Sequence, residues 1–485
     1  MAEITVGTSD VQLVIPAEMY GELQAHLFPG DEDEHGAVIL AGISRAKNRV
    51  RLLVKELHLA MDGIDYVPST RGYRKLKAEF IQSRILKARD ERLVYLAIHN
   101  HQGADNVWFS MHDMASHERG YPALIDIARG MPVGALVFAN NAVAGDIWLS
   151  QIERRPLSSA VVLGKSIRRI YPAVPKSGTH FDPRYHRQSL IFGKEGQLLL
   201  GSAKVAIIGL GGAGSQLADF LSALGVGNFV LIDPDRLELS NIPRVVRATG
   251  YHVRSWLLKK YVPAWLKEYI CRTSTKKVKL SKKVIKSNNP NANVVDIFGD
   301  FTSPDYTCEI IDCDYIFLAA DTHRARLLFN AIVHQYFIPG VQVGAKVHVD
   351  SETGRLLDIF SVCRPVRPGH GCLWCNGLIN SSRLQMESLT TEQLKAQRYG
   401  VDENIEAPSV NTLNALSTSQ AANDFLFYYA GMTMPGSNYD YVRFSPLLRG
   451  YSRDEPRKDP NCPECSNTKK GRYGRGESIK LPMQM

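Results

Sequence analysis

The chain has 485 residues, 44% of them hydrophobic, and a formal net charge of +9. This length predicts two or three domains, each with enough apolar residues for its own core. The first ten residues lack the basic and apolar stretches of a secretion signal, and no run approaches the ~20 apolar residues of a membrane span. We therefore expect a cytoplasmic protein without membrane segments. Basic residues concentrate in 254–286 and from Lys469 onward. They favour solvated faces or an acidic protein partner, because no nucleic-acid-binding module is recognisable.

Residues 1–165 are predicted to form a first domain. Residues 36–43 and 50–57 have the apolar pattern of a strand hairpin, and 93–98 that of a buried strand. A helix between them is indicated by apolar residues at helical spacing, namely Leu76, Phe80, Ile81, Ile85 and Ala88.

Residue types that bind metals follow the strand at 93–98. His99 and His101 are two positions apart, so both side chains point to the same side of an extended chain. Ser110 and Asp113 come shortly afterwards. Two imidazoles and one carboxylate make an open zinc site whose fourth position is left to water. The alternative is structural, with histidines that merely pack at a strand end and solvated acids nearby.

The stretch HNHQGADNVWFSMHD resembles the motif of the JAB/MPN (JAMM) metalloproteases, His-x-His followed by Ser-x-x-Asp. The resemblance implies that His99, His101 and Asp113 bind Zn²⁺ and that Ser110 helps to stabilise an oxyanion. The family's general base is a glutamate before the first strand, and Glu34 is the first choice, with Glu32 second. A non-catalytic JAB scaffold remains an alternative.

A second pattern, at residues 204–244, combines a glycine-rich turn with two strands and a helix. A strand at 204–208 leads into Gly209, Gly211 and Gly214, and a second strand at 228–232 ends at Asp233. Such a turn brings backbone N–H groups close to a ligand's phosphates. An acid at this spacing would ordinarily suggest NAD. Asp235, Asn241 and Arg244 favour ATP instead, because phosphoryl chemistry needs fixed donors and a cation.

This region resembles the adenylation domain of the ThiF/MoeB/HesA superfamily, which activates ubiquitin-like proteins. Further matches are Tyr185-His186-Arg187-Gln188, Lys277 twelve residues before Asn289, and Asp321 in LAADTHRARLLFN, and the resemblance covers roughly 180–465. It implies that Gly209, Gly211 and Gly214 cradle the nucleotide, that Asp233 binds the ribose, that Asn241, Arg244 and Lys277 hold the triphosphate, and that Asp321 binds Mg²⁺. It also implies a homodimer in which Arg187 reaches the ATP of the neighbouring subunit.

Two Cys-x-x-Cys pairs predict a structural zinc site. The ligands are Cys372, Cys375, Cys462 and Cys465. Between the pairs, 376–407 is predicted to be a crossover loop over the nucleotide and 412–429 a helix. Residues 251–270 interleave aromatic and basic residues, which favours an amphipathic helical cover or dimer element, or alternatively a docking surface for a protein partner. The Gly-rich basic tail is predicted to be disordered.

Many adenylating relatives carry a catalytic cysteine in the crossover loop, whereas no cysteine lies between Cys375 and Cys462 here. Three interpretations remain open. The acyl adenylate is the final product, a loop hydroxyl forms an oxyester, or Cys363 takes the acyl group after a rearrangement. The candidate hydroxyls are Ser381, Ser382, Thr390 and Thr391.

The expected fold class is α/β: an N-terminal JAB/MPN domain (1–165), a linker (166–187), a Rossmann-like ThiF adenylation domain (188–450), and the second half of the zinc knuckle with a basic tail (451–485). The expected function is ATP-dependent adenylation of a ubiquitin-like protein's C-terminal carboxylate, combined with zinc-dependent (iso)peptidase processing or removal of that protein. A conjugating-enzyme-like partner and a bacterial antiphage pathway are expected by family resemblance. The alternative is sulfur-carrier processing and activation for cofactor or siderophore biosynthesis.

Overall fold

The computed structural model describes residues 5–6, 10–68, 74–175, 182–254, 263–350, 353, 355–388, 409–432 and 438–483. Contacts divide the chain into two compact units. Unit 1 comprises residues 1–178, 334–337 and 466–480, and unit 2 comprises 179–333, 338–465 and 481–485. None of the helices in the described parts of the chain is long and apolar enough to cross a membrane.

Unit 1 is built on one mixed sheet of ten strands in the order β1-β8-β7-β6-β5-β3-β4-β2-β9-β10. The strands are β1 Thr5–Val6, β2 Asp10–Pro16, β3 Gly36–Arg45, β4 Arg49–Leu59, β5 Val94–Asn100, β6 Val133–Phe138, β7 Val143–Trp148, β8 Glu153–Pro156, β9 Ser159–Leu163 and β10 Ile167–Ile170. The helices are α1 Ala17–Leu27, α2 Ala78–Glu91 and α3 Met111–Ile127. The predicted hairpin, helix and buried strand are therefore present, with small shifts at their ends.

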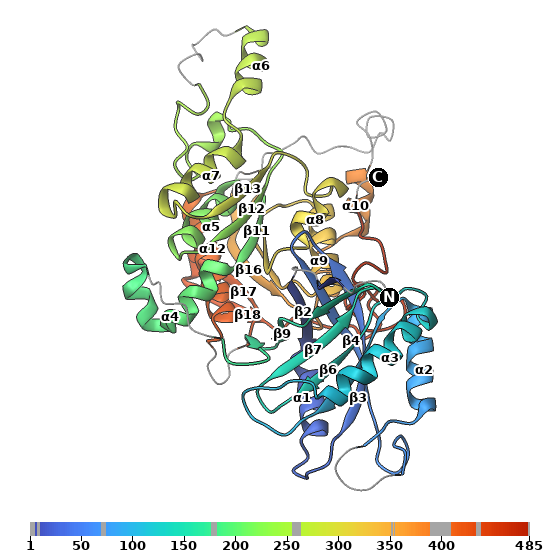
Figure 1. The fold of residues 1–485 in the computed structure, drawn as a ribbon. Helices are drawn as coiled ribbons and strands as arrows, with labels where there is room; N and C mark the ends of the chain where they lie inside the picture. Colours follow the sequence, from blue (N-terminus) through green and yellow to red (C-terminus); the bar gives the residue numbers. More distant parts are fainter. Residues whose placement is uncertain are drawn as a thin grey trace. The chain divides into compact units, whose positions relative to one another are not determined.

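Both faces of this sheet are covered, which explains why its central strands are apolar throughout (Figure 1). Tyr20 and Leu23 of α1 pack in a core with Ile39 and Leu96. On the opposite face, α2 and α3 pack against alternate residues of the same strands, in a second core. Strand β5 lies between β3 and β6, so its C-terminal end, with His99, is held on both sides.

The C-terminal segment 466–480 belongs to unit 1 and is ordered, so the predicted disorder of the tail is wrong here. Gly476 forms a bridge with Ile43 at the end of β3, and the N–H of Glu477 donates to the Ile43 carbonyl. Lys55 and Asn467 bond reciprocally: the Lys55 ammonium donates to Asn467 Oδ1 at 2.6 Å, and the Asn467 amide donates to the Lys55 carbonyl at 2.9 Å. These hydrogen bonds to β3 and β4 order a segment whose Gly-rich basic composition does not order it alone.

Unit 2 is built on one sheet of eight strands in the order β13-β12-β11-β14-β15-β16-β17-β18. The strands are β11 Lys204–Ile208, β12 Asn228–Ile232, β13 Asn293–Ile297, β14 Tyr315–Leu318, β15 Gly340–Val349, β16 Leu356–Val366, β17 Tyr441–Ser445 and β18 Gly450–Asp454. The helices are α4 His186–Ser202, α5 Gly212–Ala223, α6 Ala264–Thr273, α7 Lys277–Asn288, α8 Thr307–Ile310, α9 His323–Tyr336 (its last turn in unit 1), α10 Ser381–Ser388 and α12 Asn411–Tyr429.

Strands β11 to β15 pair in parallel and form a Rossmann-like half. Strands β15 to β18 pair antiparallel, so a meander extends the sheet from β15. Helices α5 and α7 lie on one face, and α12 continues that layer over β15 and β16 (Figure 1). The predicted crossover loop contains α10, so that part of the prediction is wrong, and 389–408 lies outside the described residues. In 251–270, α6 begins at Ala264, and Trp256, Leu257 and Tyr261 lie outside the described residues.

Candidate functional site

The nucleotide-type residues of unit 2 meet at one edge of its sheet. In the parallel ladder, Ile208 pairs with Ile232 on one side and with Leu318 on the other. The loops that follow β11, β12 and β14 therefore leave the sheet at the same level, at the carboxyl ends of the strands. This edge is the ligand site of open parallel sheets.

The glycine turn after β11 is tightly packed. Gly209 has φ +82°, and a Cβ there would lie 3.0 Å from the backbone of Ala319. A Cβ on Gly214 would lie 1.8 Å from the Gly209 carbonyl oxygen. Gly211 immediately precedes α5. The twelve-residue helix α5 thus begins against the end of β11, with its first N–H groups at the sheet edge, where they suit an anion.

Asp233 and Lys277 are brought together at this edge from different segments. The buried Asp233 carboxylate accepts hydrogen bonds from the N–H groups of Leu210 (2.6 Å) and Asp235 (2.8 Å). Burial raises the pKa of Asp233, and the Lys277 charge opposes that rise. The Lys277 ammonium, on the first residue of α7, lies 2.7 Å from the Asp235 carboxylate and 3.9 Å from that of Asp233.

Asn241 and Arg244 differ in whether their side chains already form hydrogen bonds within the fold. Asn241 is buried, and its Oδ1 accepts a hydrogen bond from the Glu238 N–H at 3.2 Å, closing a short 3₁₀ turn (Leu239–Asn241). Arg244 lies beside the start of α5, with its Cβ 3.5 Å from where a Cβ on Gly212 would be. Its guanidinium makes no hydrogen bond or ion pair with any residue that the structure describes, so it is free to meet a ligand.

Asp321 is exposed in the loop between β14 and α9. The first N–H groups of α9, from His323 and Arg324, both donate to the Glu387 carboxylate of α10 at 2.9 Å. Glu387 thereby fastens the start of the crossover segment beside Asp321. Glu387 was not predicted from the sequence, because an acid that caps a helix about 60 residues away has no spacing signature.

Arg187 stands apart from these residues on α4. Its side chain is exposed and contacts no described residue through a hydrogen bond or ion pair. Leu190 and Ile191, on the same helix, are 74% and 66% exposed. Two exposed apolar side chains beside an exposed arginine suit contact with another molecule.

The four predicted zinc cysteines form one cluster. Sγ–Sγ distances are 3.5 Å for Cys372–Cys375, 3.8 Å for Cys372–Cys462 and 3.6 Å for Cys375–Cys465. A tetrahedron with Zn–S of about 2.3 Å has edges of about 3.8 Å. Hydrogen bonds from neighbouring thiols, that of Cys465 first, lower the pKa of Cys372 to about 6. The cluster therefore fits one zinc ion.

The predicted zinc residues of unit 1 also converge. His99 Nε2 lies 3.1 Å from His101 Nε2, and the Asp113 carboxylate lies 3.7 Å and 3.6 Å from these nitrogens. A tetrahedral zinc with bonds of about 2.0 Å needs ligand separations of about 3.3 Å. His101 Nδ1–H donates to the Trp108 carbonyl at 3.0 Å, which leaves the Nε2 lone pair free. This triad fits a divalent cation with an open position.

Ser110 and Asp113 carry a structural task as well. Together they form the capping box of α3, in which Ser110 Oγ accepts from the Asp113 N–H and the Asp113 carboxylate accepts from the Ser110 N–H. Burial opposes ionisation of Asp113, but hydrogen bonds from His99 and Ser110 hold its pKa well below the ordinary value. The cap explains Ser-x-x-Asp alone, but it does not explain two imidazoles aimed at the same carboxylate.

Glu34 is half-buried before β3, close enough to the triad for its charges to act on it. Burial raises the pKa of Glu34, and His99 and His101 oppose the rise. A buried pair on α3 and β7 was not predicted: His117 Nδ1 lies 2.8 Å from the Asp146 carboxylate, which Arg154 also contacts at 2.6 Å. A histidine four residues after Asp113 on one helix face was the available indication.

The candidate acyl acceptors differ in what the structure says about them. The Cys363 thiol is buried and donates to the Asp424 carboxylate at 3.4 Å. Burial raises the pKa of Cys363 well above its ordinary value, which opposes formation of a thiolate nucleophile. Ser381 and Ser382 begin α10, whereas Thr390 and Thr391 lie outside the described residues.

Known proteins resemble the second part of the chain. A sequence model of the ThiF family matches residues 185–464, more than half of the 485 residues. The adenylyltransferase and sulfurtransferase MOCS3 of Sus scrofa is 39% identical over 105 residues, which are 20% of this chain and 23% of that protein. The tRNA threonylcarbamoyladenosine dehydratase of Bacillus subtilis is 29% identical over 141 residues, 29% of this chain and 47% of that protein. The chain thus spans less than half of the length of these relatives. The structure of E. coli MccB aligns with a TM-score of 0.42 and 18% identity over 60% of this chain and 74% of that one.

Proposed function

This chain belongs to the ThiF family, and on that premise we propose that unit 2 adenylates the C-terminal carboxylate of a ubiquitin-like or sulfur-carrier protein with ATP. The observation that carries the proposal is the convergence at one sheet edge of the glycine turn, the Asp233–Lys277 pair and Arg244, whose guanidinium has no partner among the described residues. Hydride transfer needs no such cations, whereas attack on a phosphate needs them to stabilise negative charge.

Each residue has a defined task in this proposal. Asp233 accepts hydrogen bonds from the ribose, and Asn241, Arg244 and Lys277 hold the phosphates. A carboxylate oxygen of the protein substrate attacks the α-phosphorus, the bond to the β-phosphate oxygen breaks, and pyrophosphate leaves. Mg²⁺ bound at the exposed Asp321 would neutralise charge on the leaving group. Binding ATP requires the Lys277 ammonium to exchange part of its contact with Asp235 for a phosphate.

We also propose that unit 2 works as a homodimer. The exposed Leu190 and Ile191 of α4 would bury apolar surface against the second copy, and the neighbouring Arg187 would reach that copy's ATP. With no cysteine between Cys375 and Cys462, the acyl adenylate is proposed to pass to a separate cysteine protein, such as a conjugating-enzyme-like partner.

For unit 1 we propose a zinc-dependent (iso)peptidase of the JAB/MPN type. His99, His101 and Asp113 would hold a zinc ion, which lowers the pKa of a bound water. Glu34 would accept a proton from such a water, and the Ser110 hydroxyl would donate a hydrogen bond to the oxyanion. The distances between the three side chains support this assignment. The peptide or isopeptide bond that such an enzyme cleaves is the kind of bond that conjugation of an activated ubiquitin-like protein forms. A non-catalytic scaffold is the alternative for this unit.

Two biological settings fit these activities. In a bacterial ubiquitin-like conjugation pathway, of the kind associated with antiphage defence, unit 1 would mature or remove the modifier that unit 2 activates. In sulfur-carrier biosynthesis, the same pair would process and activate the carrier, and the partial likeness to an adenylyltransferase and sulfurtransferase favours this second setting. Pyrophosphate exchange with candidate ubiquitin-like and sulfur-carrier proteins tests the proposal. Absence of exchange with all of them, despite ATP binding, would refute it.

A further inference from the structure

A buried carboxylate in unit 1, that of Asp146 on β7, bonds to the helix that carries the metal ligand Asp113. It accepts hydrogen bonds from His117 Nδ1 of α3 at 2.8 Å, from Trp148 Nε1 at 3.3 Å, and from Nε and Nη2 of Arg154 at 2.6 and 2.8 Å. Burial opposes ionisation of Asp146, but hydrogen bonds from His117 and Arg154 hold its pKa below the ordinary value. Asp146 is thus a buried charge whose oxygens are bonded to side chains from α3, β7 and β8.

The contacts of this cluster fall on the first two turns of α3. His117 comes one turn after Asp113, on the same side of the helix. The Arg154 guanidinium also reaches the Glu118 carboxylate at 3.3 Å and the Met114 sulfur at 3.7 Å. The part of α3 that carries the metal ligand is therefore held at three points by groups on β7 and β8.

Aromatic rings connect the cluster to one of the histidine ligands. Phe109, just before α3, lies edge-on to the His117 ring, with centroids 4.9 Å apart. The same Phe109 ring lies 6.0 Å from that of His99. His117 also stacks on Tyr121 at 4.7 Å. The His117 ring is thus held by two aromatic neighbours and by its bond to Asp146, and one of those neighbours also packs beside the metal site.

Stability alone is a weak reason for a buried ionic cluster. Apolar side chains of similar volume often stabilise a core as well as buried ion pairs do. Apolar packing is non-directional, however, and would hold α3 on the sheet without fixing its rotation. Hydrogen bonds do fix that rotation. A metal site needs such precision, because its ligands must lie within about 0.5 Å of the productive geometry.

We propose that Asp146 and His117 are positioning residues for the metal site of unit 1. They fix the rotation and height of α3, so that the Asp113 carboxylate meets the two histidine ligands at the end of β5. The inference rests on the zinc site proposed for unit 1. Asp113 is the one member of the triad that α3 supplies, so the affinity for the cation depends on how this helix is docked. Loss of the cluster should weaken zinc binding although every ligand remains.

The test measures zinc affinity in the full-length chain, by competition with a chelating dye, for the zinc ion that His99→Ala removes. Asp146→Asn and His117→Leu should each weaken this site by about 10- to 100-fold, the usual effect of losing a group that orients a metal ligand. His117→Asn should recover most of the affinity, because its amide N–H can take the place of the Nδ1–H. The zinc ion of the four-cysteine cluster should stay bound in all three variants.

Glu56→Gln is the matched control in unit 1. Glu56 also bonds to a histidine and a cation, with His58 at 3.1 Å and Lys87 at 2.6 Å. It pairs with Leu40 of β3, whereas the end of β5 that carries the triad pairs with Gly36. This variant should lower the melting temperature, as Asp146→Asn does, and leave the zinc affinity unchanged.

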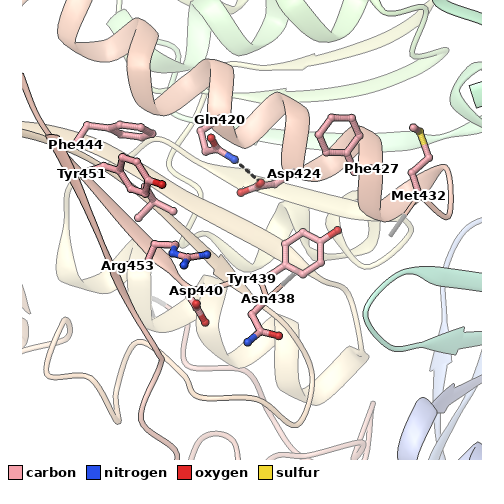
Figure 2. Close-up of a pocket in the computed structure, with 11 residues that line it drawn as sticks. Gln420, Asp424, Phe427, Met432, Asn438, Tyr439, Asp440, Phe444, Tyr451 and Arg453 are labelled. Carbon is pink, nitrogen blue, oxygen red and sulfur yellow. Dashed lines mark hydrogen bonds between the residues drawn. The ribbon is translucent and has the colours of Figure 1, made fainter. Parts of the chain in front are cut away.

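Asp424→Asn is a second control, in unit 2, where that carboxylate accepts a hydrogen bond from the Gln420 amide at 2.7 Å (Figure 2). It should bind both zinc ions like the unmodified chain. Unchanged affinity in Asp146→Asn, an equal loss in Glu56→Gln, or no gain of His117→Asn over His117→Leu would overturn the inference. If the unmodified chain binds no zinc at the triad, the inference and the proposed zinc site are both wrong. If zinc binds with the expected losses but no fusion is cleaved, the inference holds and the peptidase proposal alone is wrong.

Discussion

The two candidate catalytic centres are assembled in different ways. In unit 1 the whole triad comes from residues 99–113, one strand end, one loop and the first turn of α3. In unit 2 the corresponding residues come from the ends of β11, β12 and β14, from a 3₁₀ turn and from the first residue of α7. A contiguous site is fixed by local geometry, whereas a dispersed site exists only when the sheet register is correct. Sequence spacing alone therefore carries more weight in unit 1, and family membership carries more in unit 2.

The strongest test separates the two centres by activity. Asp321→Ala should reduce pyrophosphate exchange by about 10³-fold and leave peptide cleavage intact, because it removes the metal ligand of one centre alone. Glu34→Gln should reduce cleavage of a ubiquitin-like fusion by about 10³-fold and leave exchange intact. Both rates are measured on each variant.

Glu32→Gln, at the exposed acid two residues earlier, is the control for Glu34→Gln. It should cleave normally. If Glu32→Gln and Glu34→Gln lose cleavage equally, the assignment of the base is wrong. If neither loses any, unit 1 has no such activity, and the scaffold alternative holds.

Metal content gives the next largest effect. The purified chain should contain about two zinc ions by atomic emission, one for each tetrahedral site. His99→Ala should remove one of them with little change in thermal stability, and Cys372→Ser should remove the other and lower the melting temperature, because a closed four-thiolate site is part of the folded structure. If the chain contains a single zinc ion and His99→Ala retains it, the triad of unit 1 binds no zinc.

Packing at the glycine turn tests how the dispersed site depends on register. Gly214→Ala should destabilise unit 2 by about 3 kcal/mol, because the new methyl group would overlap the Gly209 carbonyl. Gly201→Ala is the matched control, since a Cβ there meets nothing within 4 Å. Urea unfolding of both variants measures the difference, and equal stabilities would contradict the observed turn.

The smallest expected effect concerns Lys55, whose side chain is almost fully buried against Asn467. Burial lowers the pKa of Lys55 from 10.5 to about 8. Between these values the unfolded chain binds more protons than the folded one, so the free energy of unfolding should rise with pH across this window. Urea unfolding at several pH values should show this rise relative to Lys55→Met, which has no ammonium to titrate. Parallel pH curves for the two proteins would refute the assignment.

Much of both centres could be predicted from the sequence, for reasons visible in particular residues. His99 and His101 had to share one side of a strand, and the four cysteines had to share one ion. Asp233 and Asp321 follow β12 and β14, the two parallel strands that flank β11, so their common edge follows from the βαβ pattern. Glu387 and Asp146 could not be predicted, because their partners are chosen by tertiary packing. The ordered tail was missed for the same reason: composition describes a segment by itself, and Asn467 and Glu477 acquire their order from β3 and β4.

The placement of residues 466–480 has a consequence for biosynthesis. A ribosome releases the strands of unit 1 before those of unit 2, and the segment that bonds to Ile43 and Lys55 follows unit 2's strands. Until then the Lys55 ammonium lacks its hydrogen-bond acceptor, the side-chain oxygen of Asn467. Unit 1 is thus completed only after most of unit 2 has been made, and translation that stops at Cys465 leaves unit 1 without the segment that bonds to β3 and β4.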